Sequence, residues 1–310
     1  MTEKISVVIV TRNREKLLTD CLESIIKQTR LPDEVIIVDN ASTDNAKEVI
    51  FSFKKRLPIK YIEEKQVGIP YARNRGIKET SGTLLLMLDD DCVADRFWVE
   101  RMVNAHRKYP KAWVIQGRTY SLPKNGIYSI LVESDRLLWL LSYAKKGLPV
   151  KKMRNFFSKD FRDETAIFTC DTKNLSFKTS YLRKHKLSFD TEFYRGEDTD
   201  LGKQILQKNG LIIFYPHATV GHHERSSLRE FLEQRWNTGR TNARIGNKWK
   251  LSSFASNIPR LKTLLSLLLL GRHLNQLHKL PILLILIFLD RIYRINGWFY
   301  EKIIIFFAKQ

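Results

Sequence analysis

The sequence contains little cysteine. Its three cysteines, Cys21, Cys92 and Cys170, are odd in number, and no two form a CxxC pair. Small disulfide-stapled folds and structural zinc sites both need paired thiols, so this count argues against either. We therefore expect a protein of a reducing compartment.

Long hydrophobic runs are also missing. The apolar run Val7–Val10 is short and is followed at once by Arg12 and Arg14, which is not the pattern of a secretory signal peptide. None of the later apolar blocks reaches the ~20 residues that a membrane-spanning helix requires. These blocks are Leu264–Leu270, Pro281–Leu289 and Ile303–Phe307.

Several well-known catalytic patterns do not occur. There is no Walker A pattern and no GxGxxG loop, which argues against P-loop nucleotide hydrolysis and dinucleotide redox chemistry. There is no GxSxG elbow for an acyl-transfer serine.

Positive charge is abundant. The 310 residues include 53 Lys and Arg against 33 Asp and Glu, a net charge of +20, which favours anionic partners. Lys145–Arg162 carries seven basic residues and the single acid Asp160, and we expect it to be a mobile basic loop. Residues 241–310 carry eleven basic and two acidic residues, a net +9.

Short apolar runs alternate with segments of helical spacing. This pattern is typical of βαβ units and predicts an α/β fold with a mostly parallel sheet. The expected strands are Ile5–Val10, Val35–Val38, Ile59–Ile62, Thr83–Leu88, Trp113–Gly117, Asn174–Phe177 and Leu211–Tyr215. The expected helices are Glu15–Gln28, Asp44–Phe53, Gly68–Lys78, Ile127–Leu141 and a helix from Gly196 to about Lys208.

Polar residues gather where these strands end. Thr11 and Asn13 follow the first strand, Asp39 ends the second, and Asp89–Asp91 end the Thr83–Leu88 strand. Ligands of open α/β sheets bind at the carboxyl ends of the strands. The sequence therefore predicts a binding site at this edge.

The triplet Asp89-Asp90-Asp91 indicates a metal. Three adjacent carboxylates repel one another, and a divalent cation removes that cost; oxygen ligands suit Mg²⁺ or Mn²⁺. A solvated acidic turn is the alternative.

A second acidic cluster, Glu197 to Asp200, lies about a hundred residues later. One cluster can hold the cation while the other supplies a general base. The alternative is an ordinary helix N-terminus, where acidic side chains favour the helix dipole.

Two further groups are candidates. Arg73, Asn74 and Arg75 are expected in the first turn of the helix after Gly68, where arginines can clamp a diphosphate; a surface pair with Glu79 is the alternative. His222, followed by His223, is expected beyond the end of its strand, and a lone histidine is often structural.

Six motifs in order resemble those of family-2 glycosyltransferases, over roughly residues 4 to 236. They read ISVVIVTRNR, VIIVDNASTD, GIPYARNRGI, LLLMLDDDCVAD, NLSFKTSYL and GEDTDLGKQI. The resemblance implies the GT-A fold, with a mixed, mostly parallel sheet flanked by helices, a helical C-terminal extension and an inverting, metal-dependent transfer.

The resemblance also implies roles for single residues. Thr11 and Asp39 match residues that hold the nucleotide, Arg73 one near the base and diphosphate, and Asp198, beside Glu197, the general base. In the D-x-D motif, Asp91 matches the direct metal ligand, with Asp89 as its outer partner, and Asp89 and Asp90 lie toward the ribose and metal-bound water. His222 matches a further metal ligand or phosphate contact.

The chain departs from the family pattern in three places. Val10 stands where proline is common, which affects little. Asp171-Thr172-Lys173-Asn174 replaces Gly-Gly-x-Asn, which leaves the donor sugar open. Gln234-Arg235-Trp236 is not a full Q-x-x-R-W, which argues against a processive synthase.

The expected enzyme is thus a hexosyltransferase-like glycosyltransferase of cell-surface or lipid-linked glycan synthesis. Its expected partners are a UDP-, GDP- or dTDP-linked sugar and a glycan or lipid-linked acceptor, with no nucleic acid. A sugar-1-phosphate nucleotidyltransferase and a non-catalytic glycan- or nucleic-acid-binding protein remain the alternatives. The first needs a glycine-rich phosphate loop that VTRNREKL lacks, and the second needs no paired acidic clusters.

We expect two parts, a catalytic domain of residues 1–240 and a basic, amphipathic helical tail of residues 241–310. The tail is expected to dock on an anionic membrane surface, which makes the protein cytoplasmic and peripheral on the inner face of the cell membrane. Packing of the apolar blocks on the catalytic domain, or an oligomer, is the alternative. The cations that flank the blocks are Arg260, Lys262, Arg272, Lys279, Arg291 and Arg294, and the aromatic residues nearby are Trp298, Phe299 and Tyr300.

Overall fold

The structure is a computed structural model that describes residues 3–123, 126–143, 164–251 and 277–308. Within this part of the chain the strands form one nine-stranded sheet of order β3-β2-β1-β4-β8-β6-β9-β5, with β7 paired to β9. The strands are β1 (Ile5–Thr11), β2 (Glu34–Asp39), β3 (Ile59–Glu63), β4 (Leu84–Asp89), β5 (Cys92–Ala94), β6 (Val114–Leu122), β7 (Thr165–Ile167), β8 (Asn174–Lys178) and β9 (Ile212–His223).

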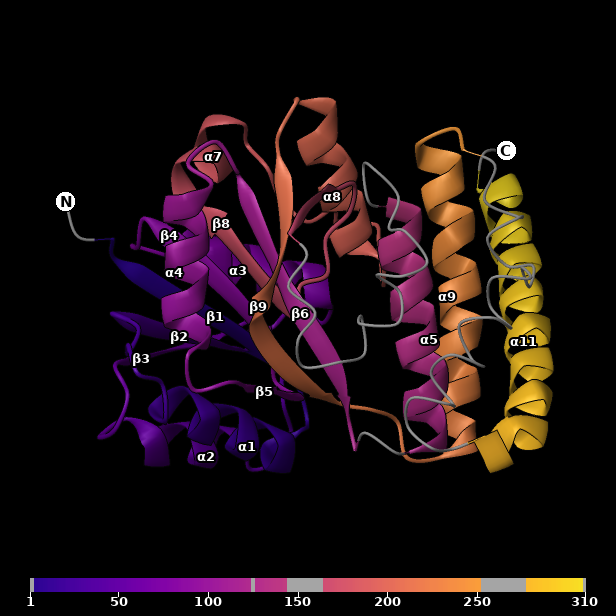
Figure 1. The fold of residues 1–310 in the computed structure, drawn as a ribbon, viewed down its shortest axis with the longest axis horizontal. Helices are drawn as coiled ribbons and strands as arrows, with labels where there is room; N and C mark the ends of the chain where they lie inside the picture. The colour runs from indigo at the N-terminus through magenta and orange to yellow at the C-terminus, as the bar shows by residue number, and fades with distance from the viewer. Residues whose placement is uncertain (1–2, 124–125, 144–163, 252–276, 309–310) are drawn as a thin grey trace.

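Helices cover both faces of the sheet and extend the molecule at one side (Figure 1). They are α1 (Glu15–Ile26), α2 (Ala46–Phe53), α3 (Ile69–Glu79), α4 (Trp98–Lys108), α5 (Ile127–Tyr143), α7 (Thr179–Lys184), α8 (Glu197–Gln207), α9 (Leu228–Lys248), the short 3₁₀ helix η2 (Leu277–Lys279) and α11 (Leu280–Phe307). The predicted mixed α/β sheet flanked by helices, with a helical C-terminal part, is confirmed.

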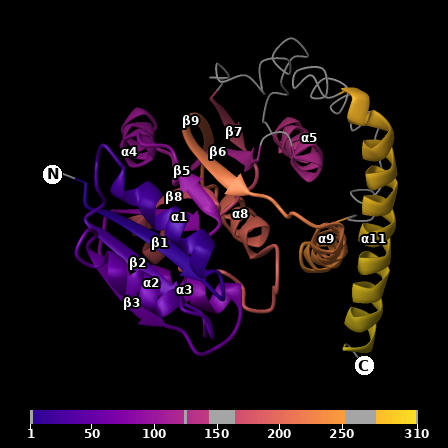
Figure 2. The ribbon, with the colours of Figure 1, turned by 90° about the horizontal axis from the view of Figure 1, so that it is seen from below.

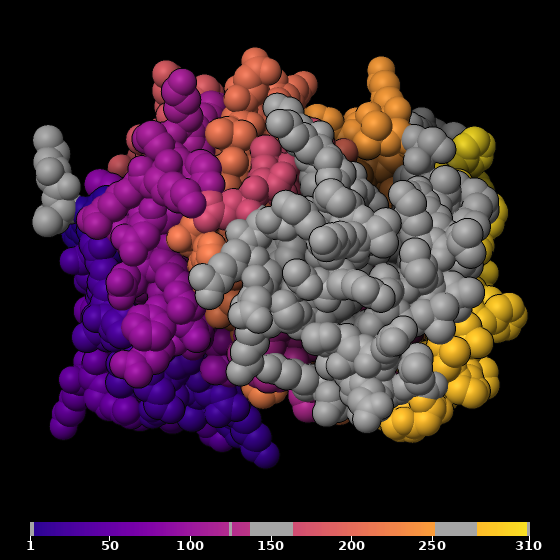
Figure 3. Space-filling view, in the orientation of Figure 1, coloured from indigo at the N-terminus to yellow at the C-terminus, as the bar shows by residue number. Residues whose placement is uncertain are grey.

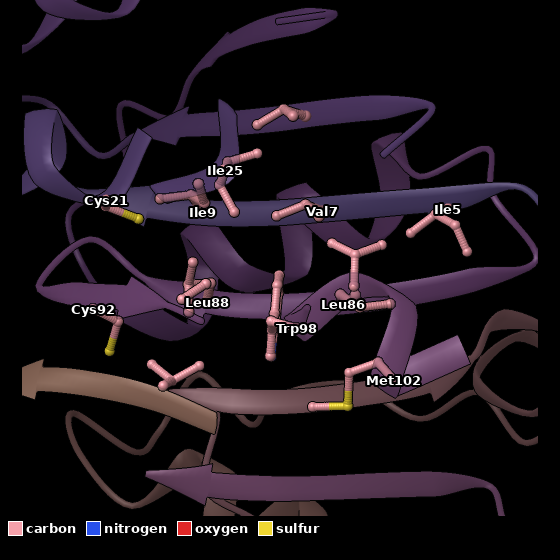
Figure 4. Close-up of a cluster of buried hydrophobic side chains, with 14 of the residues drawn as sticks. Ile5, Val7, Ile9, Cys21, Ile25, Leu86, Leu88, Cys92, Trp98 and Met102 are labelled. Carbon is pink, nitrogen blue, oxygen red and sulfur yellow. The ribbon is translucent and has the colours of Figure 1, made fainter. Parts of the chain in front are cut away.

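The side chains of the strands alternate between the two faces of the sheet and build one hydrophobic core on each face. Strands β1, β2, β3 and β4 are parallel, and β8 pairs with β4 in the antiparallel sense. Ile5, Val7 and Ile9 of β1 point to one face of the sheet, where they pack with α1, α2 and α4. Figure 4 shows this cluster, which includes Trp98 of α4. Val8 points to the other face, toward α3, α7 and α8. Because successive side chains of a strand face opposite ways, β1, β2 and β4 each contribute to both cores.

The second half of the sheet is less regular than the sequence predicts. Strand β6 extends to Leu122 and β9 to His223, and the two pair in parallel with a register shift between Gly117 and Arg118. The side chain of Asn174 fills this irregularity: its Nδ2 donates to the carbonyl oxygens of Arg118 and Ala218. The expected end of the last strand at Tyr215 is therefore wrong, because β9 continues to His223 and β6 supplies backbone partners for its last five residues, Thr219 to His223.

Helices α5, α9 and α11 lie beside one another at the edge of the molecule, and α11 is the outermost of them in both views (Figures 1 and 2). Helix α9 runs without interruption through the expected domain boundary at 240/241. No helix of the described residues is both long and apolar enough to cross a bilayer.

Two expected membrane-facing cations are not on the surface. Arg291 and Arg294 were expected to flank the apolar block as surface cations, but both are buried. Arg294 instead pairs with Asp135 of α5 at 2.6 Å and with Asp290 at 2.8 Å. That part of the expectation is corrected, because carboxylates of the protein, Asp135 and the buried Asp290, pair with these guanidinium groups. The expected basic loop Lys145–Arg162 and the block Leu264–Leu270 lie outside the described residues.

Candidate active site at the carboxyl ends of the strands

The candidate site begins where β1, β2 and β4 end together. The register of β1 sets Thr11 beside Asp39 of β2, and Val10 beside Asp89 of β4. Parallel strands end at one edge, so residues distant in the sequence meet there. The sheet thus brings together the polar strand ends that the sequence singles out.

Asp90 and Asp91 are buried under a cap made by the loop after β1. Thr11 Oγ1 donates to Asp90 at 2.8 Å, and Arg14 Nη1 reaches both Asp90, at 2.9 Å, and Asp91, at 2.8 Å. Burial, with a contribution from the adjacent Asp91, raises the pKa of Asp90 to about 6 although Arg14 opposes the shift. One guanidinium therefore screens the repulsion between two neighbouring carboxylates.

His222 faces Asp91 from the neighbouring strand. Its Nε2 lies 3.4 Å from Asp91 Oδ1, and its Nδ1 is hydrogen-bonded to Glu224 at 2.9 Å. The histidine lies inside β9, paired with Cys92 of β5, so the expectation that it follows the strand is wrong. Burial alone would lower the pKa of His222, but Asp91 and Glu224 outweigh it and raise the value to about 9. Burial would likewise raise the pKa of Asp91, but His222 and Arg14 hold it well below its usual range.

A row of charges that sequence reasoning missed continues from Glu224 into α5. Arg136 donates to Glu224 at 2.7 Å, and to Glu133 and Ser121 at 2.6 and 2.7 Å. The spacing of Glu133 and Arg136, three residues apart on a helix, is the only sequence signal for this pair. Arg136 thus holds Glu224, and Glu224 fixes the orientation of the His222 ring through its hydrogen bond to Nδ1.

Arg73 joins the two acidic clusters. Its Nη2 donates to Asp89 at 2.8 Å, and its Nη1 contacts Glu197 at the start of α8. Helix α3 begins at Ile69, so Arg73 lies in its second turn and not in the first as expected. Its neighbour Arg75 is the one that pairs with Glu79, at 3.2 Å. A buried guanidinium between two carboxylates ties the end of β4 to the start of α8.

The acidic residues at the start of α8 have different surroundings. Glu197 is bound to Arg73, whereas Asp200 accepts from Lys248 and Trp249 at the end of α9. Asp198, by contrast, has no direct ion pair among the described residues; its Oδ1 accepts from the backbone N–H of Thr199 at 2.6 Å. The lack of a described ion pair distinguishes Asp198 from Glu197 and Asp200.

The electrostatic surroundings of Asp198 suit a base. Burial and the nearby Asp171 raise its pKa, while Lys173 and Arg73 act in the opposite direction. Lys173 Nζ pairs with Asp171 at 2.7 Å, and burial would lower its pKa but Asp171, Asp89 and Asp198 raise it. Asp171, which stands at the first glycine of the family's Gly-Gly-x-Asn, thus forms a salt bridge with Lys173 near the candidate base.

The helix that carries Asp198 needs a glycine before it. Gly196 has a φ of +82°, and a Cβ there would lie 2.1 Å from Cγ2 of Thr241 in α9. Only glycine adopts this conformation without strain, and only glycine leaves room for α9. The position of Asp198 therefore depends on residues on both sides of 240/241.

The nucleotide-binding candidates near β2 are held by protein contacts. Asp39 accepts from Ser42 N–H at 3.0 Å and from the Tyr61 hydroxyl at 3.1 Å. Burial, and then Asp39, raise the pKa of Tyr61 to about 12. Asn13, with a φ of 54°, accepts from Thr43 N–H at 2.7 Å and so joins the loops after β1 and β2.

Within the described residues, no three His, Cys, Asp or Glu side chains converge as a complete metal site. Of the two outer aspartates of the D-x-D motif, Asp91 pairs with the imidazole of His222, whereas Asp89 pairs with Arg73. Arg14 was not singled out as a site residue, although its place three residues beyond β1 is a usable signal.

Comparisons with known proteins agree on one family and one fold. The chain matches the sequence model described as Glycosyl transferase family 2 over residues 6–186. A dolichyl N-acetyl-alpha-D-glucosaminyl phosphate 3-beta-D-2,3-diacetamido-2,3-dideoxy-beta-D-glucuronosyltransferase of Methanococcus voltae is 24% identical over 74% of this chain and 70% of that protein. The uncharacterized glycosyltransferase YwdF of Bacillus subtilis is 42% identical over 59% of this chain and 68% of that protein.

The fold is similar to that of a solved mannosyltransferase. PcManGT from Pyrobaculum calidifontis, in complex with GDP-Man and Mn²⁺, superposes with a TM-score of 0.58 at 17% identity. The match covers 92% of this chain and 74% of that one. At this identity the likeness concerns the fold alone.

Proposed function

Because the chain belongs to glycosyl transferase family 2 and has a GT-A fold, we propose that it moves a sugar from a nucleotide-diphosphate sugar to an acceptor hydroxyl with inversion at the anomeric carbon. The observation that carries the proposal is the ion-pair bridge through Arg73. It ties Asp89 of the D-x-D motif to Glu197, the residue next to Asp198. This bridge supports a site in which the proposed donor-binding and base groups lie close together.

Asp198 is the proposed general base. It takes the proton of the acceptor hydroxyl as the acceptor oxygen bonds to the anomeric carbon and the bond from that carbon to the diphosphate breaks. Attack from the face opposite the diphosphate inverts the configuration in one displacement. A raised pKa makes a carboxylate a stronger proton acceptor near neutral pH, and burial gives Asp198 that shift. Glu197 supports it by holding Arg73.

Asp91 and His222 fit a divalent cation, Mg²⁺ or Mn²⁺. A carboxylate oxygen and an imidazole nitrogen 3.4 Å apart can share one ion once the ring gives up its proton to the solvent, and Glu224 on the second ring nitrogen is the usual support of such a histidine. These metals are commonly held by one or two carboxylates plus substrate phosphates. The ion would neutralise charge on the diphosphate leaving group; Asp89 and Asp90 would lie toward ribose and metal-bound water.

The nucleotide is proposed to bind over the ends of β1 and β2. Thr11 and Asp39 would hold base and ribose, with Asn13 keeping their loops together. Arg73 would lie near the diphosphate. A UDP-, GDP- or dTDP-linked sugar fits this arrangement equally well, because no described side chain selects one base.

The acceptor is proposed to be a glycan or lipid-linked glycan at the inner face of the cell membrane, where the protein works as a peripheral, cytoplasmic enzyme. The Methanococcus voltae relative is described as acting on a dolichyl phosphate-linked sugar. Net charges of +20 for the chain and +9 for residues 241–310 would draw it to anionic lipid.

A donor screen tests the proposal. Melting temperatures are measured with UDP-, GDP- and dTDP-sugars, each with Mn²⁺, and the best donor is then used for transfer. We expect one nucleotide to raise the melting temperature and the product to have the inverted anomeric configuration by NMR. Retention of configuration, or no response to any donor, would contradict the proposal.

A further inference from the structure

Helix α11 has its charged side inside and its apolar side outside. Asp290, Arg291, Arg294 and Glu301 are all buried, and no charged residue of α11 is exposed. Seven large apolar side chains on the opposite side are 49–66% exposed, and we call them the outer face: Ile282, Ile285, Phe288, Phe299, Ile303, Phe306 and Phe307. A surface helix in water has the reverse arrangement.

The inner side of α11 is locked by ion pairs. Glu301 is fully buried and accepts from Arg240 and Arg244 of α9, at 2.6 and 2.5 Å. Arg294 is held by Asp135 of α5 and by Asp290. Breaking a buried pair strands an uncompensated charge, which is strongly unfavourable. Helix α11 therefore cannot rotate its outer face inward.

Two glycines bring the helices into close contact. A Cβ on Gly239 would lie 1.9 Å from Arg294 O, and one on Gly297 would lie 2.2 Å from Trp236 O. Backbones can approach this closely only where side chains are absent, as in packed helices of small residues. The outer face is thus a fixed property of the fold, presented at the margin of the molecule where α11 is coloured yellow (Figures 2 and 3).

We propose that the outer face of α11 inserts into the headgroup–acyl boundary of an anionic bilayer, with the helix lying in the membrane plane. This inference rests on the proposed function, because a lipid-linked acceptor requires the enzyme at a membrane. The 28 residues of α11 make a helix about 42 Å long, and their apolar side chains recur along its length. Such a helix docks along the surface and does not cross it.

Charge selects the bilayer over a second copy of the chain. Each copy carries a net charge of +20, so two copies joined face to face would repel each other, whereas anionic lipid attracts the same charge. Lys302, half-buried near the C-terminal end of α11, can extend its ammonium group toward headgroups while the apolar side chains enter the membrane.

A site-specific fluorophore tests the contact directly. All three native cysteines are buried, so an introduced surface cysteine can be labelled with bimane. We compare full-length Ile285→Cys with Leu31→Cys, a control at an exposed apolar residue of the catalytic domain. With phosphatidylglycerol vesicles, emission should shift to the blue at 285 and not at 31. Vesicle binding without a shift at 285 would overturn the proposal.

A second pair of variants measures what the face contributes. Phe288→Ser with Phe299→Ser should lower vesicle partitioning at least about tenfold, since each phenyl ring loses its transfer into lipid. Leu31→Ser with Phe51→Ser, also exposed, should change it little. If instead light scattering shows a dimer that the first pair dissociates while partitioning is unchanged, a second copy covers the face and the proposal fails.

These readouts are independent of catalysis. A blue shift at residue 285 in a protein that turns over no nucleotide sugar would leave the docking inference standing and overturn the proposed function. Turnover of a soluble acceptor without vesicle binding would do the reverse.

Discussion

At the residue scale, neighbouring carboxylates differ because their partners differ. Glu197 neutralises Arg73 and Asp200 neutralises Lys248, so both are structural anchors. Asp198 lies between them without such a partner among the described residues, and its pKa is raised by burial and by Asp171. Perturbed pKa values cluster at functional sites, which is why Asp198 and not its neighbours is the proposed base.

The first prediction separates the base from its neighbour. Asp198→Asn should lower the transfer rate by about 10²–10⁴ while donor affinity is kept, because only proton removal is lost. Glu197→Gln should cost less. Transfer rates and donor affinity by calorimetry check this; an active Asp198→Asn beside a dead Glu197→Gln would exchange the two roles.

The second prediction concerns pH. Because burial raises the pKa of Asp198 above its ordinary 3.8, the fraction of reactive carboxylate falls as pH drops through that raised value. The rate at saturating substrate should therefore decline on the acid side at a higher pH than an exposed aspartate would give. A pH–rate profile of the parent checks this, and Asp198→Asn should lack that limb. The same limb in Asp198→Asn would assign it to another group.

Metal removal gives the third prediction. EDTA should abolish transfer, and Asp91→Ala should do the same, because the diphosphate would lose its counter-charge. Transfer measured with Mn²⁺, with EDTA and after re-addition of Mn²⁺ tests this. Full turnover in EDTA would refute the role of the ion.

Residues that act through others were the hardest to foresee. The sequence places Asp89, Asp90 and Asp91 at a strand end because five apolar residues precede them, and the structure agrees in position. The place of Arg14 just beyond β1 suggests a site residue but not which carboxylates it pairs with, and nothing in the sequence indicates that Arg136 supports Glu224. Such contacts join segments dozens of residues apart, and local patterns carry no information about them.

At the element scale, local pattern sufficed where strands are short, buried and parallel. Strands β1, β2, β3 and β4 lie within a residue or two of their expected ranges. The two long strands β6 and β9, which pair with each other in parallel, were predicted only in part. Gly117, Pro216 and Gly221 interrupt their apolar pattern, and the pairing between the two strands keeps these segments extended. Helix α4 was not assigned, although Trp98, Val99, Met102 and Val103 have helical spacing.

The fourth prediction tests the crossing of α9 and α11. Gly297→Ala gains helix propensity of about 1 kcal/mol, but its Cβ would lie 2.2 Å from Trp236 O. Overpacking costs about 1–3 kcal/mol, so the free energy of unfolding should fall or at best stay level. Asn296→Ala, exposed on the same helix, is the control and should stabilise slightly. Denaturant unfolding of both variants decides; a more stable Gly297→Ala would mean that the helices do not cross so closely.

At the scale of the whole molecule, the expected division into residues 1–240 and 241–310 falls within a continuous unit of structure. Thr241 Oγ1 donates to Arg195 O, and Lys248 pairs with Asp190 and Asp200. The far end of α9 thus holds the loop that precedes Asp198. In the described part of the chain, the apolar outer face begins with α11, well beyond this boundary.

The final prediction concerns how vesicle binding depends on salt, because the net charge and the outer face of α11 should respond to salt differently. An interaction driven by charge alone disappears when salt shortens the Debye length from about 10 Å at 0.1 M to about 3 Å at 1 M. Insertion of apolar side chains does not weaken in this way. The full-length protein should therefore sediment with phosphatidylglycerol vesicles at 0.1 M NaCl, lose much of that binding at 1 M, and keep a remainder that Phe288→Ser with Phe299→Ser removes. Vesicles of neutral phosphatidylcholine should bind only this remainder at either salt concentration. Equal binding to both lipids at 0.1 M would show that the +20 charge plays no part, and complete release at 1 M would show that the apolar face stays outside the membrane.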